Sequence, residues 1–269
     1  MKRFTLILFL AGLLLHVHAQ HPIKDPNFFP EVYVFADRVN LRYLPDLSSR
    51  VVATVPEGTV LHEIANWGKD TINGKVGLWK KVYYRDEIVF VWSRLLAKAV
   101  IQSQTDPTVR FMLGRGAGLR EGSIKAFRNG KKYATHAFQT SRDLQTVYEL
   151  ETYGSQGLSG IKDILSFISY GSACGQRTDH FYFAWDGENI HPFITTYGIP
   201  DGEYFDYTEV ILPYDSGGKA GKVQVALRQG EMLHTSQKVE DPRSSPEIRY
   251  TVHSLLTYQW KQHKLVRIE

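Results

Sequence analysis

The chain has 269 residues, of which 43% are hydrophobic, 13% aromatic and 22% charged. This balance is typical of a folded protein and excludes a largely disordered one. Its formal charge is +4, and without Lys2 and Arg3 at the N-terminus it is about +2, from 30 basic and 28 acidic residues. The basic residues form no dense stripe, and we therefore expect no nucleic-acid partner.

The N-terminal segment has the features of an export signal. Its positive start is followed by the apolar run Phe4–Val17 and by the small-x-small sequence Val17-His18-Ala19, which together are typical of a secretory signal peptide. The run is shorter than the about 20 residues of a membrane span, so an uncleaved anchor is the weaker alternative. We expect cleavage near Ala19-Gln20, export to the periplasm or the extracellular space, and no membrane span in the mature chain.

A proline-rich stretch, residues 20–31, is predicted to form a lead-in arm, and residues 32–98 then have the pattern of short strands. Residues 32–37 alternate with a period of two. The Asn73-Gly74 dipeptide is a strong hairpin signal. Five short strands in about 60 residues predict a small barrel or sandwich.

The predicted barrel contains a series of short motifs: Val39-Asn40-Leu41-Arg42, Pro45, Gly58-Thr59, Trp79-Lys80-Lys81-Val82 and Phe90-Val91-Trp92-Ser93. In this order they resemble the bacterial Src-homology-3-like (SH3b) domain over residues 33–97. Val89 stands where that family usually has glycine, and the hairpin over residues 66–76 is longer than the family's minimum. The resemblance implies an exported module that binds cell-wall peptides or attaches a partner domain.

Aromatic side chains of the predicted barrel are the candidates for ligand binding, because flat rings bind extended chains at a low entropic cost. Tyr43 and Trp67 lie beside turn residues, and we expect them to be exposed. The interior of a small barrel must be filled by side chains, and for this we expect Leu41, Val52, Trp79 and Val82. The candidate ligand-binding residues are Tyr33, Tyr43, Trp67, Tyr83 and Trp92.

The remaining chain, residues 105–269, is predicted to be a larger β-rich domain. Hairpins are expected over residues 123–133, 180–191 and 256–268, the first two turned by Asn-Gly and Asp-Gly. One helix is expected near residues 159–168, where Ser159 can cap it and four apolar residues recur at helical spacing. The predicted fold class is therefore mostly β: a small SH3-like barrel, then a domain of antiparallel hairpins with one α-helix.

Cys174 is the only cysteine of the chain, so an intramolecular disulfide is excluded, and its thiol is one candidate nucleophile. A thiol nucleophile needs a nearby base, and the nearest following histidine is His180. In the peptidases that carry SH3b domains, the cysteine begins a helix, where the helix dipole lowers its pKa, whereas Cys174 follows the predicted helix. Catalysis by Cys174 with His180 is therefore the weaker hypothesis.

No cofactor and no metal site are expected. The acidic residues of the stretch 201–215 have a spacing that fits no calcium loop, and the glycines of residues 114–118 lack the strand and helix that flank a phosphate-binding loop.

The leading hypothesis is an exported, non-enzymatic bacterial binding or scaffolding protein. Its barrel, or the cleft between its domains, would recognise cell-wall peptide, glycan or an exported protein partner. The alternative is a cell-wall-acting hydrolase whose C-terminal domain uses Cys174 or a pair of carboxylates.

Overall fold

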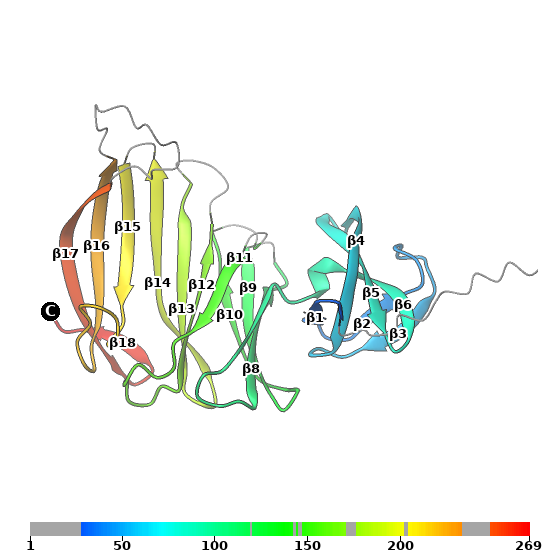
Figure 1. Ribbon diagram of the computed structural model, residues 1–269, viewed down its shortest axis with the longest axis horizontal. Helices are drawn as coiled ribbons and strands as arrows, with labels where there is room; N and C mark the ends of the chain where they lie inside the picture. The colour runs from blue at the N-terminus through cyan, green and yellow to red at the C-terminus, as the bar shows by residue number, and fades with distance from the viewer. Residues whose placement is uncertain are drawn as a thin grey trace, which may run out of the picture.

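The structure is a computed structural model that describes residues 28–118, 120–141, 144, 147–170, 176–201, 204–232 and 248–269. The predicted signal peptide, most of the predicted arm and Cys174 lie outside these residues. The described chain is almost entirely antiparallel β-structure (Figure 1), which confirms the prediction of a mostly β fold. In that part of the chain, no helix has the length and apolar character to cross a membrane.

The N-terminal sheet has six strands in the order β1-β4-β5-β6-β2-β3. Apolar residues from all parts of this sheet share one core, which includes Val34, Leu41, Leu61, Val82 and Val91. A sheet whose strands all face one core must curl around it, and we call this unit the N-terminal barrel. Its strands are β1 (Glu31–Tyr33), β2 (Val39–Arg42), β3 (Val51–Val55), β4 (Val60–Ile72), β5 (Lys75–Tyr84) and β6 (Glu87–Trp92).

The rest of the described chain forms two further sheets, one of four strands and one of eight. The four-stranded sheet has the order β10-β9-β8-β7, and it comprises β7 (Ala99–Gln102), β8 (Val109–Arg115), β9 (Glu121–Arg128) and β10 (Lys131–Gln139). The eight-stranded sheet runs in chain order through β11 (Val147–Thr152), β12 (Asp163–Ser169), β13 (Thr178–Trp185), β14 (Ile190–Asp201), β15 (Tyr204–Ile211), β16 (Val223–Met232), β17 (Ile248–Lys261) and β18 (Lys264–Arg267).

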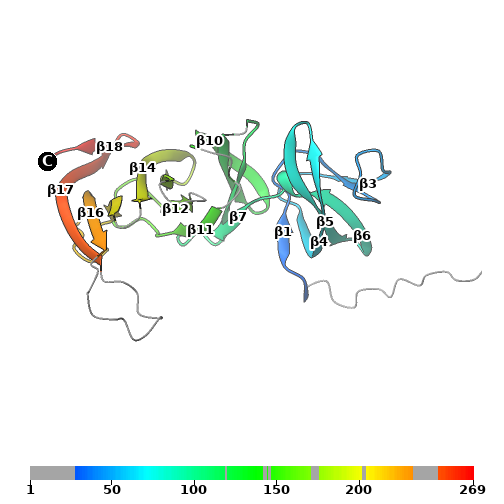
Figure 2. The ribbon, with the colours of Figure 1, turned by 90° about the horizontal axis from the view of Figure 1, so that it is seen from above.

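Strands β12 and β13 are buried on both faces. Leu165 and Phe183 point into a core shared with β8 and β9 of the four-stranded sheet. Ile164 and Tyr182, on the opposite face, belong to a second core that reaches β15, β16 and β18. Figure 2 shows the N-terminal barrel at one end of the molecule and β17 and β18 at the other.

The prediction of a helix near residues 159–168 is wrong. Residues 163–169 form the strand β12, which pairs with β11 on one side and with β13 on the other. The apolar residues Ile164, Leu165 and Phe167 are all buried, on both faces of the sheet. A short run that is apolar on both faces satisfies helical spacing as well as the requirements of a central strand, and here the flanking strands decide.

The three expected hairpins are present. Strands β9 and β10 turn at Asn129-Gly130, and β13 and β14 turn at the Asp-Gly sequence of residues 186–187. Strands β17 and β18 turn at Gln262-His263, where both residues have positive φ.

Candidate binding site

The N-terminal barrel packs against the outer face of the four-stranded sheet. Along β8, Phe111 and Leu113 point into the inner core, whereas Met112 packs with Phe127 against Tyr33 and Phe35 of the barrel. This alternation follows from the period of two in a strand. The two faces of one sheet thus hold the inner core and the docked barrel.

The contact at Phe35 leaves no room for a larger residue on β8. A Cβ atom added at Gly114 would lie 2.4 Å from the Phe35 ring, so glycine permits this close approach. Beside this contact, Lys125 of β9 places its Nζ atom 2.6 Å from Oε2 of Glu57 and 2.7 Å from the carbonyl oxygen of Phe35. The barrel is therefore fixed to the sheet by apolar packing and by an ion pair.

A cavity of about 500 Å³ lies on one side of this contact, and we call it the junction cavity. Both units contribute to it, and its lining is strongly basic. The barrel supplies Lys75 and Arg94, the sheet supplies Arg115 and Lys125, and Glu121 is the acidic residue of the lining. The Nζ atom of Lys75 donates to the carbonyl oxygen of Ala117 at 2.6 Å, across the junction.

Trp92, a predicted ligand-binding residue, forms part of the wall of the junction cavity. Its side chain is buried, and its indole N–H has no hydrogen-bond acceptor in the described chain. The ring lies directly against Gly77, where an added Cβ would be 2.3 Å from Nε1. Trp92 thus combines an apolar wall with a polar atom that is not satisfied.

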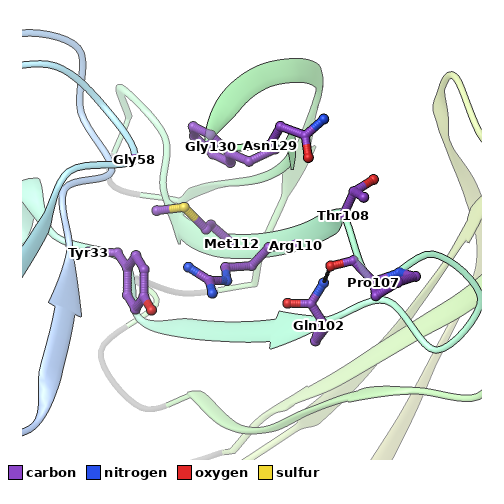
Figure 3. A pocket seen from close by; sticks show the side chains of 10 residues that line it. Tyr33, Gly58, Gln102, Pro107, Thr108, Arg110, Met112, Asn129 and Gly130 are labelled. Carbon is purple, nitrogen blue, oxygen red and sulfur yellow. Dashed lines mark hydrogen bonds between the residues drawn. The ribbon is translucent and has the colours of Figure 1, made fainter.

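A second, smaller hollow of about 230 Å³ lies between the same two units (Figure 3). Tyr33 lines it, and the guanidinium of Arg110 lies 4.9 Å from the centre of the Tyr33 ring. Burial and a hydrogen bond to Glu31 raise the pKa of Tyr33, so its hydroxyl stays protonated at neutral pH. Figure 3 also shows Gln102 donating to the carbonyl oxygen of Pro107, at 2.7 Å.

The other predicted aromatic residues lie elsewhere on the barrel. Tyr43 is 56% exposed and Trp67 is 60% exposed, which confirms the expected exposure of both. Cations lie beside both rings, Arg50 at Tyr43 and Lys81 at Trp67. The predicted interior residues Leu41, Trp79 and Val82 are buried, and Val52 is partly buried.

Tyr83 is placed differently from the exposed rings. Its side chain is 6% exposed, and its hydroxyl donates to Asp86 at 2.8 Å. The five predicted residues therefore do not share one groove: Tyr33 and Trp92 reach the two hollows, Tyr43 and Trp67 lie on the surface, and Tyr83 is buried.

His180, the candidate base, belongs to a polar cluster within the eight-stranded sheet. Its Nδ1 atom lies 3.1 Å from the hydroxyl of Tyr182, and the two rings are 4.3 Å apart. Just after β11, the hydroxyl of Tyr153 hydrogen-bonds Glu151 and lies 3.1 Å from Oγ of Ser166 in β12. Burial lowers the pKa of His180 to about 4 and outweighs the opposing charge of Glu151. His180 is therefore neutral at pH 7, and its lowered pKa makes it a weak base.

Carboxylates of the acidic stretch 201–215 are engaged in local contacts. Glu209 pairs with Arg228 of the neighbouring strand at 2.5 Å, and Asp215 accepts a hydrogen bond from the backbone N–H of Leu212 at 2.7 Å. A different group, Asp186, His191 and His263, has donor atoms close enough together to hold a metal ion.

Sequence reasoning missed the basic residues of the junction cavity. They are scattered over β5, β8 and β9 and the turn after β6, and no local pattern links them. Only the docking of the barrel on the sheet brings them together.

Together the fold and the cavity define an all-antiparallel β protein in which a small barrel is docked on a curled sheet domain, with a basic cavity between them. No protein-family model, curated protein or solved structure matches the chain.

Proposed function

We propose that this chain is an exported, non-enzymatic bacterial binding protein whose junction cavity recognises a carboxylate-bearing cell-wall peptide or glycan. The SH3b resemblance of residues 33–97 supports the wall as the source of the ligand. The signal-peptide features of residues 1–19 support an exported protein.

The composition of the junction cavity is the observation that carries this proposal. Four cationic side chains and one anionic side chain line a space of about 500 Å³. Lys125 is paired with Glu57, and three further cations of the lining, Lys75, Arg94 and Arg115, stand against the single carboxylate of Glu121. Guanidinium and ammonium groups recognise carboxylates by charge-assisted hydrogen bonds, and Trp92 adds a flat apolar wall for a sugar ring or a side chain.

The junction is also preformed. The Glu57–Lys125 pair and the packing of Phe35 against Gly114 hold the two walls of the cavity at a fixed distance. A ligand that binds between fixed walls does not have to order them, which favours affinity.

A sedimentation assay with purified cell wall tests the proposal. We expect the protein to bind the wall, and we expect Lys75→Met and Arg115→Gln each to weaken binding at least fivefold, since each removes a cation from the cavity. Lys69→Met is the matched control, because it removes an exposed cation of β4 that does not line the cavity. No binding of the native protein, or an equal loss in the Lys69 variant, would refute the proposal.

The variant Trp67→Ala distinguishes binding in the junction cavity from binding on the exposed aromatic surface of the barrel. If this variant alone loses binding, the barrel surface is the site and the junction cavity is not. Release of soluble wall fragments that is abolished by Cys174→Ala would support the hydrolase instead.

A further inference from the structure

Two hairpin turns far apart in the chain bring three metal-ligating side chains together. Asp186 lies in the turn between β13 and β14, His191 follows at the start of β14, and His263 lies in the turn between β17 and β18. The rings of His191 and His263 are stacked, with centroids 4.3 Å apart. One donor atom from each of the three residues lies within 4.8 Å of the other two.

The carboxylate of Asp186 is held in one orientation. Its Oδ1 atom accepts the backbone N–H groups of Glu188 and Asn189, both at 2.7 Å. Its Oδ2 atom is thereby directed at the histidines, 2.6 Å from Nε2 of His191 and 3.6 Å from Nδ1 of His263. A ligand oriented by such hydrogen bonds is typical of a prepared metal site.

The spacing of these atoms suits a small divalent ion. In a tetrahedral zinc site with bonds of about 2.0 Å, neighbouring ligand atoms are about 3.3 Å apart. The two Asp186–His distances lie on either side of this value, and all three donor atoms lie within 4.8 Å of one another, so modest side-chain movements would bring them to this spacing. The ion would replace the proton shared by His191 and Asp186, and that proton would move to Nδ1 of the ring or to solvent.

We propose that Asp186, His191 and His263 form a binding site for a divalent ion of the zinc class, with water as the remaining ligand. Two imidazoles and one carboxylate are a donor set that zinc accepts in proteins. His263 is 59% exposed, whereas Asp186 is 14% exposed, so an ion can enter from solvent and meet a largely enclosed carboxylate. The sequence predicted no metal site because its ligands lie in separate hairpins.

The site lies where the curl of the eight-stranded sheet brings the β17–β18 hairpin close to β14. Among the described residues, β18 pairs through its backbone with β17, and β14 pairs with β13 and β15. Contact between β14 and the last hairpin is made by side chains such as Phe193, Trp260 and Leu265. A bound ion would therefore fasten the last hairpin to the β13–β14 turn.

Zinc binding by the tag-free full-length protein tests the proposal, measured by equilibrium dialysis with metal analysis and by thermal unfolding. We expect about one equivalent of zinc and a melting temperature that rises with zinc concentration. His263→Asn and Asp186→Asn should each weaken zinc binding more than tenfold. The side-chain amide introduced by Asp186→Asn keeps an oxygen acceptor for the two backbone N–H groups, so this variant is expected to fold.

His62→Asn, in β4 of the N-terminal barrel, is the matched control, since it removes a histidine far along the chain from the site. It should bind zinc as the native protein does. The ring of Trp260 lies 6.4 Å from that of His191, so Cu²⁺ at the site should quench Trp260 fluorescence, and Trp260→Phe should remove that part of the signal. Absence of zinc binding by the native protein, or equal binding by the Asp186 and His263 variants, would overturn the proposal.

Discussion

Glu57 of the N-terminal barrel and Lys125 of β9 form an ion pair across the junction, with Oε2 and Nζ 2.6 Å apart. Their side chains are 12% and 13% exposed, so the pair is shielded from solvent. Lys132 of β10 contacts the other carboxylate oxygen. One carboxylate thus connects the barrel to two strands of the sheet that forms the opposite wall of the junction cavity.

Replacement of Glu57 by glutamine should destabilise the protein. It leaves the ammonium of Lys125 enclosed with no opposite charge, and we expect the free energy of unfolding to fall by about 2 kcal/mol. Urea denaturation measures the change. Glu63→Gln is the matched control, because Glu63 pairs with Lys80 of the same barrel. Both of these side chains are 20% exposed, so we expect the free energy of unfolding to fall by less than about 1 kcal/mol. Equal losses in both variants would contradict a special role for the junction pair.

The Glu57 effect should depend on pH. Burial alone would raise the pKa of Glu57, but hydrogen bonds and charges from Lys125 and Lys132 outweigh it and hold the pKa below the ordinary 4.5. With a lower pKa in the folded state, the stabilisation is fully present above about pH 4.5 and is lost as the pH falls through the folded value. Unfolding free energies of the native protein and Glu57→Gln should therefore differ by a constant amount near neutral pH and converge in acid.

The close contact at Gly114 predicts that an alanine there destabilises the protein more than an alanine at Gly68 does. Gly114→Ala should lower the free energy of unfolding by about 1 to 3 kcal/mol, because its Cβ would overlap the Phe35 ring and the barrel would have to move. In Gly68→Ala the added Cβ meets nothing within 4 Å, so its stability should be nearly unchanged. Comparison of the two denaturation midpoints checks this prediction. If Gly114→Ala left the stability unchanged, the barrel would be able to move away from β8 at no energetic cost.

Much of the fold could be predicted from local patterns. The Asn-Gly and Asp-Gly turns and the alternating strands predicted the hairpins, since these signals act between neighbouring residues. The prediction of a helix near residues 159–168 was wrong because Ile164 and Leu165 are buried on opposite faces of one strand. Leu165 packs against the four-stranded sheet and Ile164 against later strands of its own sheet, and neither contact is visible in the local sequence.

The candidate sites were less accessible to prediction. Trp92 could be selected as an aromatic residue of a recognisable motif, but Lys75 and Arg115 come together only because the N-terminal barrel packs on the four-stranded sheet. His191 and His263 are likewise brought together by the curl of the sheet. Contacts made by tertiary docking leave no periodic signal in the sequence.

His180 should resist protonation in the folded protein. Burial lowers its pKa from 6.5 to about 4, so the unfolded chain takes up a proton first as the pH falls. The free energy of unfolding is therefore unaffected by His180 above about pH 6.5. Between that value and about pH 4 it falls by up to about 3 kcal/mol as the unfolded chain binds the proton.

Two measurements check the prediction for His180. The imidazole resonance, followed by NMR, should titrate near pH 4, and His180→Gln should flatten the pH dependence of unfolding over that range. An imidazole midpoint near pH 6.5 would mean that solvent reaches the ring.

The last hairpin turn contains residues that disfavour its conformation. Gln262 and His263 have φ values of 49° and 61°, whereas the β4–β5 turn uses Asn73 and Gly74 at 50° and 73°. Asparagine tolerates the left-handed region better than glutamine, so Gln262→Asn should raise the free energy of unfolding by about 0.5 kcal/mol. The reverse change, Asn73→Gln, should lower it by a similar amount, and thermal unfolding of both variants without metal measures the pair. Because Gln262→Asn retains His263, this variant should bind zinc with the same affinity as the native protein. Its stability and its zinc affinity therefore report separately on the strain of the turn and on the proposed metal site. If both variants were as stable as the native protein, the two turns would tolerate either side chain and His263 would occupy its position at no conformational cost.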